Sequence, residues 1–230
     1  GEYLQDLASD LLKDLGNGAV SKEKSEAIAD LAPGALKRTL DEIRGVLGKL
    51  GGSPCYLQAD ACDRESLQRA YGEIKGMVPD IHGVVHSALG TYDQSLVSME
   101  EEQFLDTYSC KADICLRIAQ VFQNEPLDFV LFFSSMAAFG KDGGMSAYSA
   151  GCAFEDAYAL NLAKEWGCIA KTVNWGYWSV GGGGRISDSM AQHLDRNGIM
   201  EITAREGLKE LEGLMVGPWN QLAILKTKRP

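Results

Sequence analysis

Short apolar runs alternate with longer stretches of helical periodicity along this chain. Continuous apolar runs bounded by turn residues predict strands at residues 55–59, 81–87, 127–135, 169–175 and 221–226. Apolar residues at helical spacing predict helices at about residues 3–15, 22–31, 36–50, 64–77, 101–123, 187–197 and 204–215. One more helix begins at Tyr148, after a glycine-rich loop at residues 140–144. This alternation predicts an α/β fold with a doubly wound parallel sheet, because right-handed crossovers place successive strands side by side.

The composition fits one globular domain that spans residues 1–230. Of the 230 residues, 45% are hydrophobic and 23% are charged. The formal net charge of −10 argues against binding nucleic acid or an anionic membrane through a broad basic face. Because no apolar stretch is long enough to span a membrane and the first residues form no signal sequence, we expect a cytoplasmic protein.

No sequence pattern predicts a metal site. The six cysteines form no Cys-x-x-Cys pair, and we expect them to be buried, reduced thiols. His82 and His86 lie four residues apart in one expected strand and share a face, but no third ligand follows at a suitable spacing. We therefore expect no bound metal.

Three side chains suggest a site that reduces a ketone. Ser135 ends the apolar run at residues 127–135, and Tyr148 follows at the start of a helix. In open α/β sheets, ligands bind beyond the carboxyl ends of the strands, where these two residues can meet. A phenol is a weak acid at neutral pH, so a nearby ammonium is needed to favour its ionised form, and Lys111 is the candidate. The Ser135 hydroxyl can hold the substrate oxygen, whereas a nicotinamide cofactor must supply the hydride.

Several motifs, in order along the chain, are similar to those of one family. They read YLQADACD at residues 56–63, HGVVHSA at 82–88, VLFFSS at 130–135, YSAGCAFEDA at 148–157 and NWGYW at 174–178. From about Leu36 to its end, the chain resembles the catalytic ketoreductase subdomain of modular polyketide synthases, a branch of the short-chain dehydrogenase/reductase family. Lys111 lies upstream on its own helix, as in that branch and unlike the usual Tyr-x-x-x-Lys arrangement. The glycine-rich residues 181–185 look more like the synthases that use a free-standing acyltransferase.

The resemblance implies a Rossmann-like fold of the short-chain dehydrogenase/reductase type and a specific activity. Such domains use NADPH to reduce a β-ketoacyl thioester, carried by an acyl carrier protein, to a β-hydroxyacyl thioester. The tyrosine, serine and lysine have the roles given above. By the same resemblance Asp60, Ala61, Ala88 and Gly176 border the cofactor. Asp60 is equally suited to capping the next helix.

The resemblance also implies a stereochemical outcome and partners. Asp93 matches the aspartate of the class that forms a D-configured hydroxyl, and Gly140 stands where the opposite class carries a tryptophan. The implied partners are the acyl carrier protein and neighbouring domains of the synthase, with no nucleic acid and no membrane.

Three departures from the family pattern leave the activity open. We find no glycine-rich turn for the dinucleotide phosphates, and the first two strands are missing. Cys152 stands in place of an asparagine, and a thiol cannot copy the paired donor and acceptor of an amide. Leu89 stands where a glycine lets the backbone approach the cofactor closely.

Two interpretations follow from these departures. Either the sequence lacks segments that an active enzyme possesses, or the domain is a non-catalytic pseudo-ketoreductase that acts as a scaffold in a megasynthase. In the second case residues 1–35, an atypical helical part, replace the nucleotide-binding half. A free-standing short-chain reductase is a third interpretation, which the upstream position of Lys111 disfavours.

Overall fold

The computed structural model describes residues 55–90, 94–140, 143–178, 192 and 194–228. By its internal contacts the chain forms two units, residues 1–58 with 181–193 and residues 59–180 with 194–230. The first unit lies almost entirely outside the described residues, as do the helices expected at residues 3–15, 22–31 and 36–50. Only the second unit is therefore described, and one domain over residues 1–230 stays a prediction.

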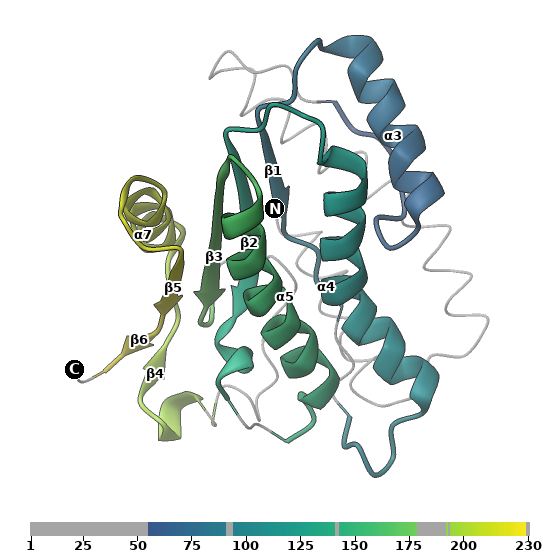
Figure 1. The fold of residues 1–230 in the computed structure, drawn as a ribbon. Helices are drawn as coiled ribbons and strands as arrows, with labels where there is room; N and C mark the ends of the chain where they lie inside the picture. Colours follow the sequence, from purple (N-terminus) through teal and green to yellow (C-terminus); the bar gives the residue numbers. More distant parts are fainter. Residues whose placement is uncertain (1–54, 91–93, 141–142, 179–191, 193, 229–230) are drawn as a thin grey trace. The chain divides into compact units, whose positions relative to one another are not determined.

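A parallel sheet of four strands forms the centre of the second unit (Figure 1). The strands, in their order across the sheet, are β1 (Gly83–His86), β2 (Phe129–Ser135), β3 (Ile169–Trp175) and β5 (Gln221–Ile224). β2 and β3 pair over their whole length, from Phe129 opposite Ile169 to Ser135 opposite Trp175. Because all four strands are parallel, their carboxyl ends lie at one edge of the sheet.

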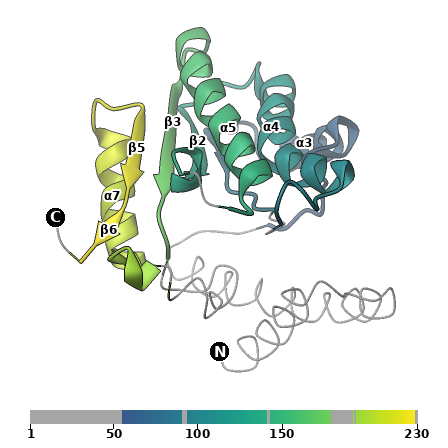
Figure 2. The ribbon, with the colours of Figure 1, turned by 90° about the horizontal axis from the view of Figure 1, so that it is seen from below.

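Helices cover both faces of this sheet. They are α3 (Arg64–Met77), α4 (Glu101–Phe122), α5 (Ser146–Glu165) and α7 (Ala204–Val216). α4 and α5 lie side by side on one face, and α7 lies against the other (Figure 2). Alternate residues of β2 face the two cores, since Val130 and Phe132 pack beneath α4 and α5 whereas Leu131 packs with Leu214 of α7. The apolar run of β2 is thus buried on both sides, which confirms the predicted doubly wound parallel sheet.

The periodicity of the sequence located most of these elements. α3, α4, α7 and β3 begin and end within one residue of their predicted bounds. β1 and β2 each begin two residues later than expected, at Gly83 and Phe129. Tyr148 lies in the first turn of α5, as predicted.

Two of the predictions differ from the structure, and a third is described only in part. Residues 55–59 form no strand, and none of the described strands pairs with them. The strand expected at 221–226 divides after Ile224, because β6 (Lys226–Thr227) pairs antiparallel with β4 (Ile199–Met200) and leaves the main sheet. β4 and β6 are too short to show an alternating pattern. Of the helix expected at 187–197, residues 194–196 are helical, and most of the rest lies outside the described residues.

The cysteines differ in exposure more than expected. All six lie among the described residues, where no two of them form a disulfide. Cys115 and Cys152 are buried, but Cys55 is exposed and the other three are half-buried. The prediction of buried thiols is therefore wrong for Cys55, which lies in the segment that forms no strand. None of the described helices combines the length and the apolar character needed to cross a membrane.

Candidate active site

Ser135 lies at the carboxyl edge of the sheet. It is the last residue of β2 and the N-cap of a short 3-10 helix, Met136–Ala138. The Ser135 Oγ accepts a hydrogen bond from the backbone N–H of Ala137 at 3.1 Å. This bond fixes the orientation of the hydroxyl group, which is only half-buried.

Tyr148 meets Ser135 at this edge. α5 starts at Ser146, so Tyr148 lies in its first turn, and the Ser135 side chain interacts with the phenol. The tyrosine is 8% exposed. The predicted pair of a serine at a strand end and a tyrosine at a helix start is therefore brought together in space.

The phenol of Tyr148 is kept in its protonated form. Burial raises the pKa of the phenol above its ordinary value of 10, and the neighbouring Cys152 raises it further. The interaction with Ser135 lowers this pKa, but its effect is smaller. We predicted that an ammonium would favour the phenolate. The structure instead presents a neutral phenol, which is a proton donor at neutral pH.

Lys111 is buried in the seam between α4 and α5. Its ammonium donates a hydrogen bond to the backbone oxygen of Phe133 at 2.6 Å and lies 3.2 Å from the Glu155 carboxylate. Gly151, one turn after Tyr148, allows this approach, because a Cβ at that position would lie 3.0 Å from the Lys111 Cβ. The lysine thus sits behind Tyr148, with its charge directed to a carboxylate that the sequence did not predict.

Cys152 occupies the centre of the site. Its side chain is fully buried and interacts with Tyr148, and its backbone oxygen accepts a hydrogen bond from the Ser134 Oγ at 3.5 Å. Burial is the main cause that raises the pKa of the thiol to about 11, so the group is neutral near pH 7. Sequence reasoning treated this cysteine as a loss, yet the structure makes it a direct neighbour of the phenol.

A buried polar network lies beneath the pair and was missed by sequence reasoning. The Asn174 amide donates to Asp156 at 2.8 Å and lies 3.1 Å from the backbone oxygen of Ser135. The amide oxygen accepts from Gln221 at 2.8 Å. The strand register places Asn174 opposite Ser134, and Asp156 lies on the buried face of α5. The network ties β2, β3, β5 and α5 together below the site, and the only signal for it was polar residues in buried positions.

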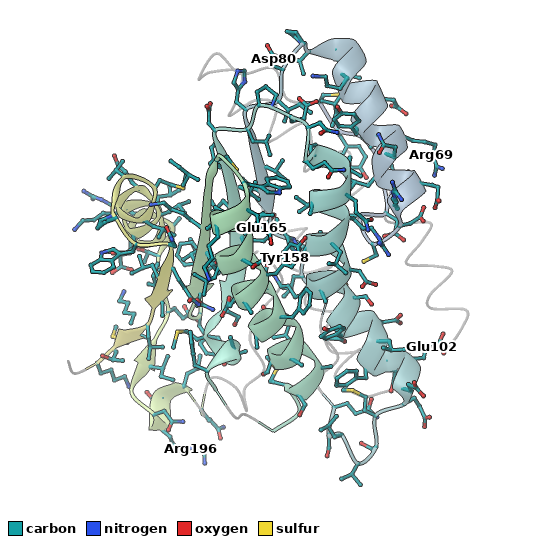
Figure 3. The ribbon with its side chains drawn as sticks, in the orientation of Figure 1. Arg69, Asp80, Glu102, Tyr158, Glu165 and Arg196 are labelled. Carbon is teal, nitrogen blue, oxygen red and sulfur yellow. The ribbon has the colours of Figure 1, made fainter. Side chains whose placement is uncertain are left out.

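Two further buried ionisable side chains lie behind Lys111. Glu155 is fully buried, and burial raises its pKa to about 8 despite the opposing effect of Lys111. His86, at the end of β1, is 2% exposed, and burial followed by the charge of Lys111 lowers its pKa to about 3. Figure 3 shows α4 and α5 side by side with the side chains between them. Sequence reasoning weighed His86 only as a metal ligand and did not consider Glu155.

The residues predicted to border a cofactor are distributed over two places. Ala88 follows β1 and Gly176 follows β3, so both lie at the same edge as Ser135. A Cβ at position 176 would lie 2.8 Å from the backbone oxygen of Ile224, so glycine is needed there for packing. Asp60 and Ala61 belong to the turn that precedes α3.

Asp60 does not cap α3. Its carboxylate accepts a hydrogen bond from the backbone N–H of Cys62 at 2.9 Å, whereas the N-cap is Asp63, which accepts from Ser66 at 2.9 Å. The capping alternative is therefore wrong for Asp60, because the helix begins one residue after Asp63. Asp93, the predicted stereochemical marker, lies outside the described residues.

Comparisons with known proteins agree with this arrangement. The model of the family described as KR domain matches residues 38–180. The chain is 45% identical over 179 residues to polyketide synthase PksN of Bacillus subtilis (strain 168), a match that covers 77% of this chain and 3% of that protein. The chain thus spans a small part of the length of the curated relative it matches.

Two solved structures share the fold. One, described as an N-terminal ketoreductase from a macrolactin assembly line, matches with a TM-score of 0.75 at 22% identity and covers 84% of this chain and 38% of that chain. The other, a short-chain dehydrogenase from Burkholderia cenocepacia J2315 in complex with NADP, matches with a TM-score of 0.69 at 19% identity and covers 80% of each chain. At these identities the likeness shows the fold.

Proposed function

Since this chain belongs to the KR domains of polyketide synthases, we propose that it reduces a β-ketoacyl thioester to a β-hydroxyacyl thioester. The observation that carries the proposal is that the Tyr148 phenol and the Ser135 hydroxyl interact with one another at the carboxyl edge of the sheet. A neutral phenol and a hydroxyl at one place are the groups that a ketone oxygen needs when it becomes an alkoxide.

In the proposed reaction, Ser135 donates a hydrogen bond to the ketone oxygen and stabilises the negative charge that develops there. Tyr148, a neutral phenol in this site, transfers its proton to the same oxygen. Its phenolate then recovers a proton before the next turnover. NADPH, when bound, supplies the hydride that the ketone carbon receives.

The described residues fit the nicotinamide end of such a cofactor. Ala88 and Gly176 follow β1 and β3 at the edge where Ser135 ends β2, so small side chains flank the hydroxyl. The Leu89 side chain is 61% exposed and is turned toward solvent. NADPH is proposed as the donor because the short-chain dehydrogenase with the same fold was solved with NADP.

The finer points of the assignment are proposals of the same kind. The substrate would be carried by an acyl carrier protein, and neighbouring domains would belong to the same synthase, because the relative is itself a polyketide synthase. The D-configured product rests on Asp93 alone. The cysteine that suggested a non-catalytic scaffold leaves Tyr148 beside Ser135, so this site does not favour the scaffold.

The test is NADPH oxidation with a β-ketoacyl thioester of N-acetylcysteamine. Tyr148→Phe should lower kcat at least about 100-fold, and Ser135→Ala by a comparable factor, because each loses a group that acts on the ketone oxygen. Tyr158→Phe is the matched control, since Tyr158 is on the same helix and away from the edge (Figure 3). An unchanged kcat in Tyr148→Phe, or no turnover by the wild-type protein in its synthase, would overturn the proposal.

A further inference from the structure

Three ionisable side chains from three elements are buried together behind the candidate site. Glu155 of α5 is 0% exposed, Lys111 of α4 is 1% exposed and His86 of β1 is 2% exposed. A charge removed from water in this way is strongly destabilising unless it is paired. The proposed reduction gives Lys111 a reason to be here, but it gives none for a carboxylate.

The geometry pairs Glu155 with both neighbours. One carboxylate oxygen lies 3.2 Å from the Lys111 ammonium, and the other lies 3.5 Å from the His86 Nε2. The backbone N–H of Ala88 donates to the His86 Nδ1 at 3.4 Å, so the hydrogen of the neutral ring is on Nε2 and faces Glu155. The carboxyl group therefore has an ammonium on one side and a neutral imidazole ring on the other.

A metal ion is a poorer occupant of this cluster. A ligand atom from His86, Cys115 and Glu155 comes within 4.8 Å of each of the others, which is close enough to surround an ion. The Lys111 ammonium, however, already neutralises Glu155 at 3.2 Å and would repel a second cation. The Cys115 thiol is also held neutral, since burial raises its pKa.

Glu155 is connected to the proton donor along one face of α5. Tyr148, Cys152 and Glu155 follow each other at intervals of four and three residues, and all three are buried. Cys152 interacts with Tyr148, and it feels the charges of both Lys111 and Glu155. The charge of Glu155 also acts directly on Tyr148, in the direction that keeps the phenol protonated.

We infer that Glu155 is a positioning residue of the proposed reductase. It anchors the Lys111 ammonium in the seam between α4 and α5, and its charge acts on Tyr148 in the direction that keeps the phenol protonated. The inference rests on the proposed function, because it gives Glu155 a part in the proton transfer to the ketone. It adds a carboxylate to the three side chains that the sequence indicated.

The inference has a consequence for the pH dependence of the reduction. The groups that face Glu155 are His86 from β1, Lys111 and Cys115 from α4, and Tyr148, Cys152 and Asp156 from α5. Below its pKa of about 8, Glu155 is neutral and does not hold the proton on Tyr148, so the phenol is a stronger acid. Above that pH the carboxylate is charged, and its charge makes the phenol a weaker acid. The kcat for reduction should therefore fall as the pH rises through about 8.

Glu155→Gln tests this consequence, because the amide imitates the protonated carboxyl group. We expect the kcat of the wild-type protein to fall about fivefold to tenfold between about pH 7 and 9, and that of Glu155→Gln to change less than about twofold, with KM unchanged in both. Glu165→Gln, at the exposed end of the same helix, should retain the wild-type profile. If the fall persists in Glu155→Gln, the inference is wrong and the proposed function stands.

A second measurement does not depend on turnover. The difference in infrared absorption between wild-type protein and Glu155→Gln should show a carboxylic-acid band that disappears as the pH rises through about 8. If the wild-type protein shows no turnover, the proposed function is wrong. The infrared band then tests the titration of Glu155 by itself, and its absence contradicts the inference. Should Glu155→Gln fail to fold, Glu155→Asp replaces it in both measurements. The shorter carboxylate of Glu155→Asp should shift the pH at which kcat falls and the pH at which the infrared band disappears. A pH profile of kcat that does not move contradicts the inference.

Discussion

At the scale of residues, Cys152 changes what a departure from the family pattern means. The thiol is fully buried and interacts with Tyr148. It is neutral near pH 7, since burial raises its pKa to about 11. A neutral thiol is a weak donor and acceptor, so its main effects are to fill space and to keep water from the phenol.

Cys152→Ala and Cys152→Asn separate these effects. Cys152→Ala should lower the free energy of unfolding by about 1 kcal/mol and change kcat less than about threefold, because only a weak hydrogen-bond partner is lost. Cys152→Asn adds volume at a position without free space and should destabilise by about 1–3 kcal/mol. Urea unfolding and NADPH oxidation measure the two quantities. A loss of kcat in Cys152→Ala as large as that in Tyr148→Phe would show that the thiol takes part in proton transfer.

The sequence predicted the residues that act on substrate better than those that support them. Ser135 and Tyr148 stand at positions that any parallel α/β sheet brings to one edge, so spacing was sufficient to pair them. Glu155 lies in a helix where a charged residue normally indicates a solvent-facing position. Its burial depends on Lys111, forty-four residues earlier on another helix, and such a pair is visible only once the two helices are packed.

At the scale of elements, the closeness of α4 and α5 depends on Gly151. A Cβ there would lie 3.0 Å from the Lys111 Cβ and 3.2 Å from the backbone oxygen of Tyr108. The second contact is to backbone and cannot be relieved by a rotation. Gly72, in the middle of α3, has nothing within 4 Å of such an atom.

Alanine at these two glycines should have opposite effects. Gly151→Ala pushes the helices apart and should lower the free energy of unfolding by about 1–3 kcal/mol and reduce kcat, because Lys111 is displaced. Gly72→Ala should raise the free energy of unfolding by about 0.4–1 kcal/mol, because alanine favours the helix and loses less backbone freedom on folding than glycine does. Urea unfolding of both variants gives the signs. Stabilisation by Gly151→Ala would mean that α4 and α5 separate without cost.

A buried lysine joins β3 to the end of α7. Lys171 is 5% exposed, and its ammonium donates to the backbone oxygens of Leu214 at 2.6 Å and Gly217 at 2.7 Å. These oxygens belong to the last turn of α7 and to its C-cap, where a positive charge also interacts favourably with the helix dipole. One side chain thus satisfies a helix end that has no basic residue of its own.

Lys171→Met should therefore uncouple α7 from the sheet. It leaves both oxygens without this donor, and we expect a loss of about 1–3 kcal/mol in the free energy of unfolding. Faster amide hydrogen exchange in the last turn of α7 would locate the effect. Lys164→Met, on the exposed side of α5, is the control and should change stability by less than about 0.5 kcal/mol. Equal stability of the two variants would contradict a capping role.

The elements that the sequence missed share a physical cause. β4 and β6 have two residues each and are defined by their pairing with one another, so neither carries its own periodic signal. Residues 55–59 show the opposite case, because a short run of mostly apolar residues does not make a strand when no described strand pairs with it. Long elements that bury an apolar face, such as α4 and β3, were located within one residue.

At the scale of the whole molecule, buried ionisable groups make stability depend on pH. Burial raises the pKa of Glu155 from 4.5 to about 8 and lowers that of His86 from 6.5 to about 3. Below pH 4.5, Glu155 is protonated in both states and does not lower the free energy of unfolding. As the pH rises from 4.5 to 8, it lowers that free energy increasingly, because the folded state keeps the proton that the unfolded state has lost. For His86 the sign is reversed. It does not lower the free energy of unfolding above pH 6.5, but it lowers that free energy increasingly as the pH falls toward 3.

The two effects oppose each other between pH 4.5 and 6.5, and only that of Glu155 remains between 6.5 and 8. The free energy of unfolding should therefore fall over the upper range, by at most about 1.4 kcal/mol per pH unit for this one group. Urea unfolding at a series of pH values measures it. Glu155→Gln should remove the fall, whereas Glu165→Gln should give a curve parallel to that of the wild-type protein. A wild-type slope that survives in Glu155→Gln would place the titrating group elsewhere, for example at Asp156, whose pKa burial also raises.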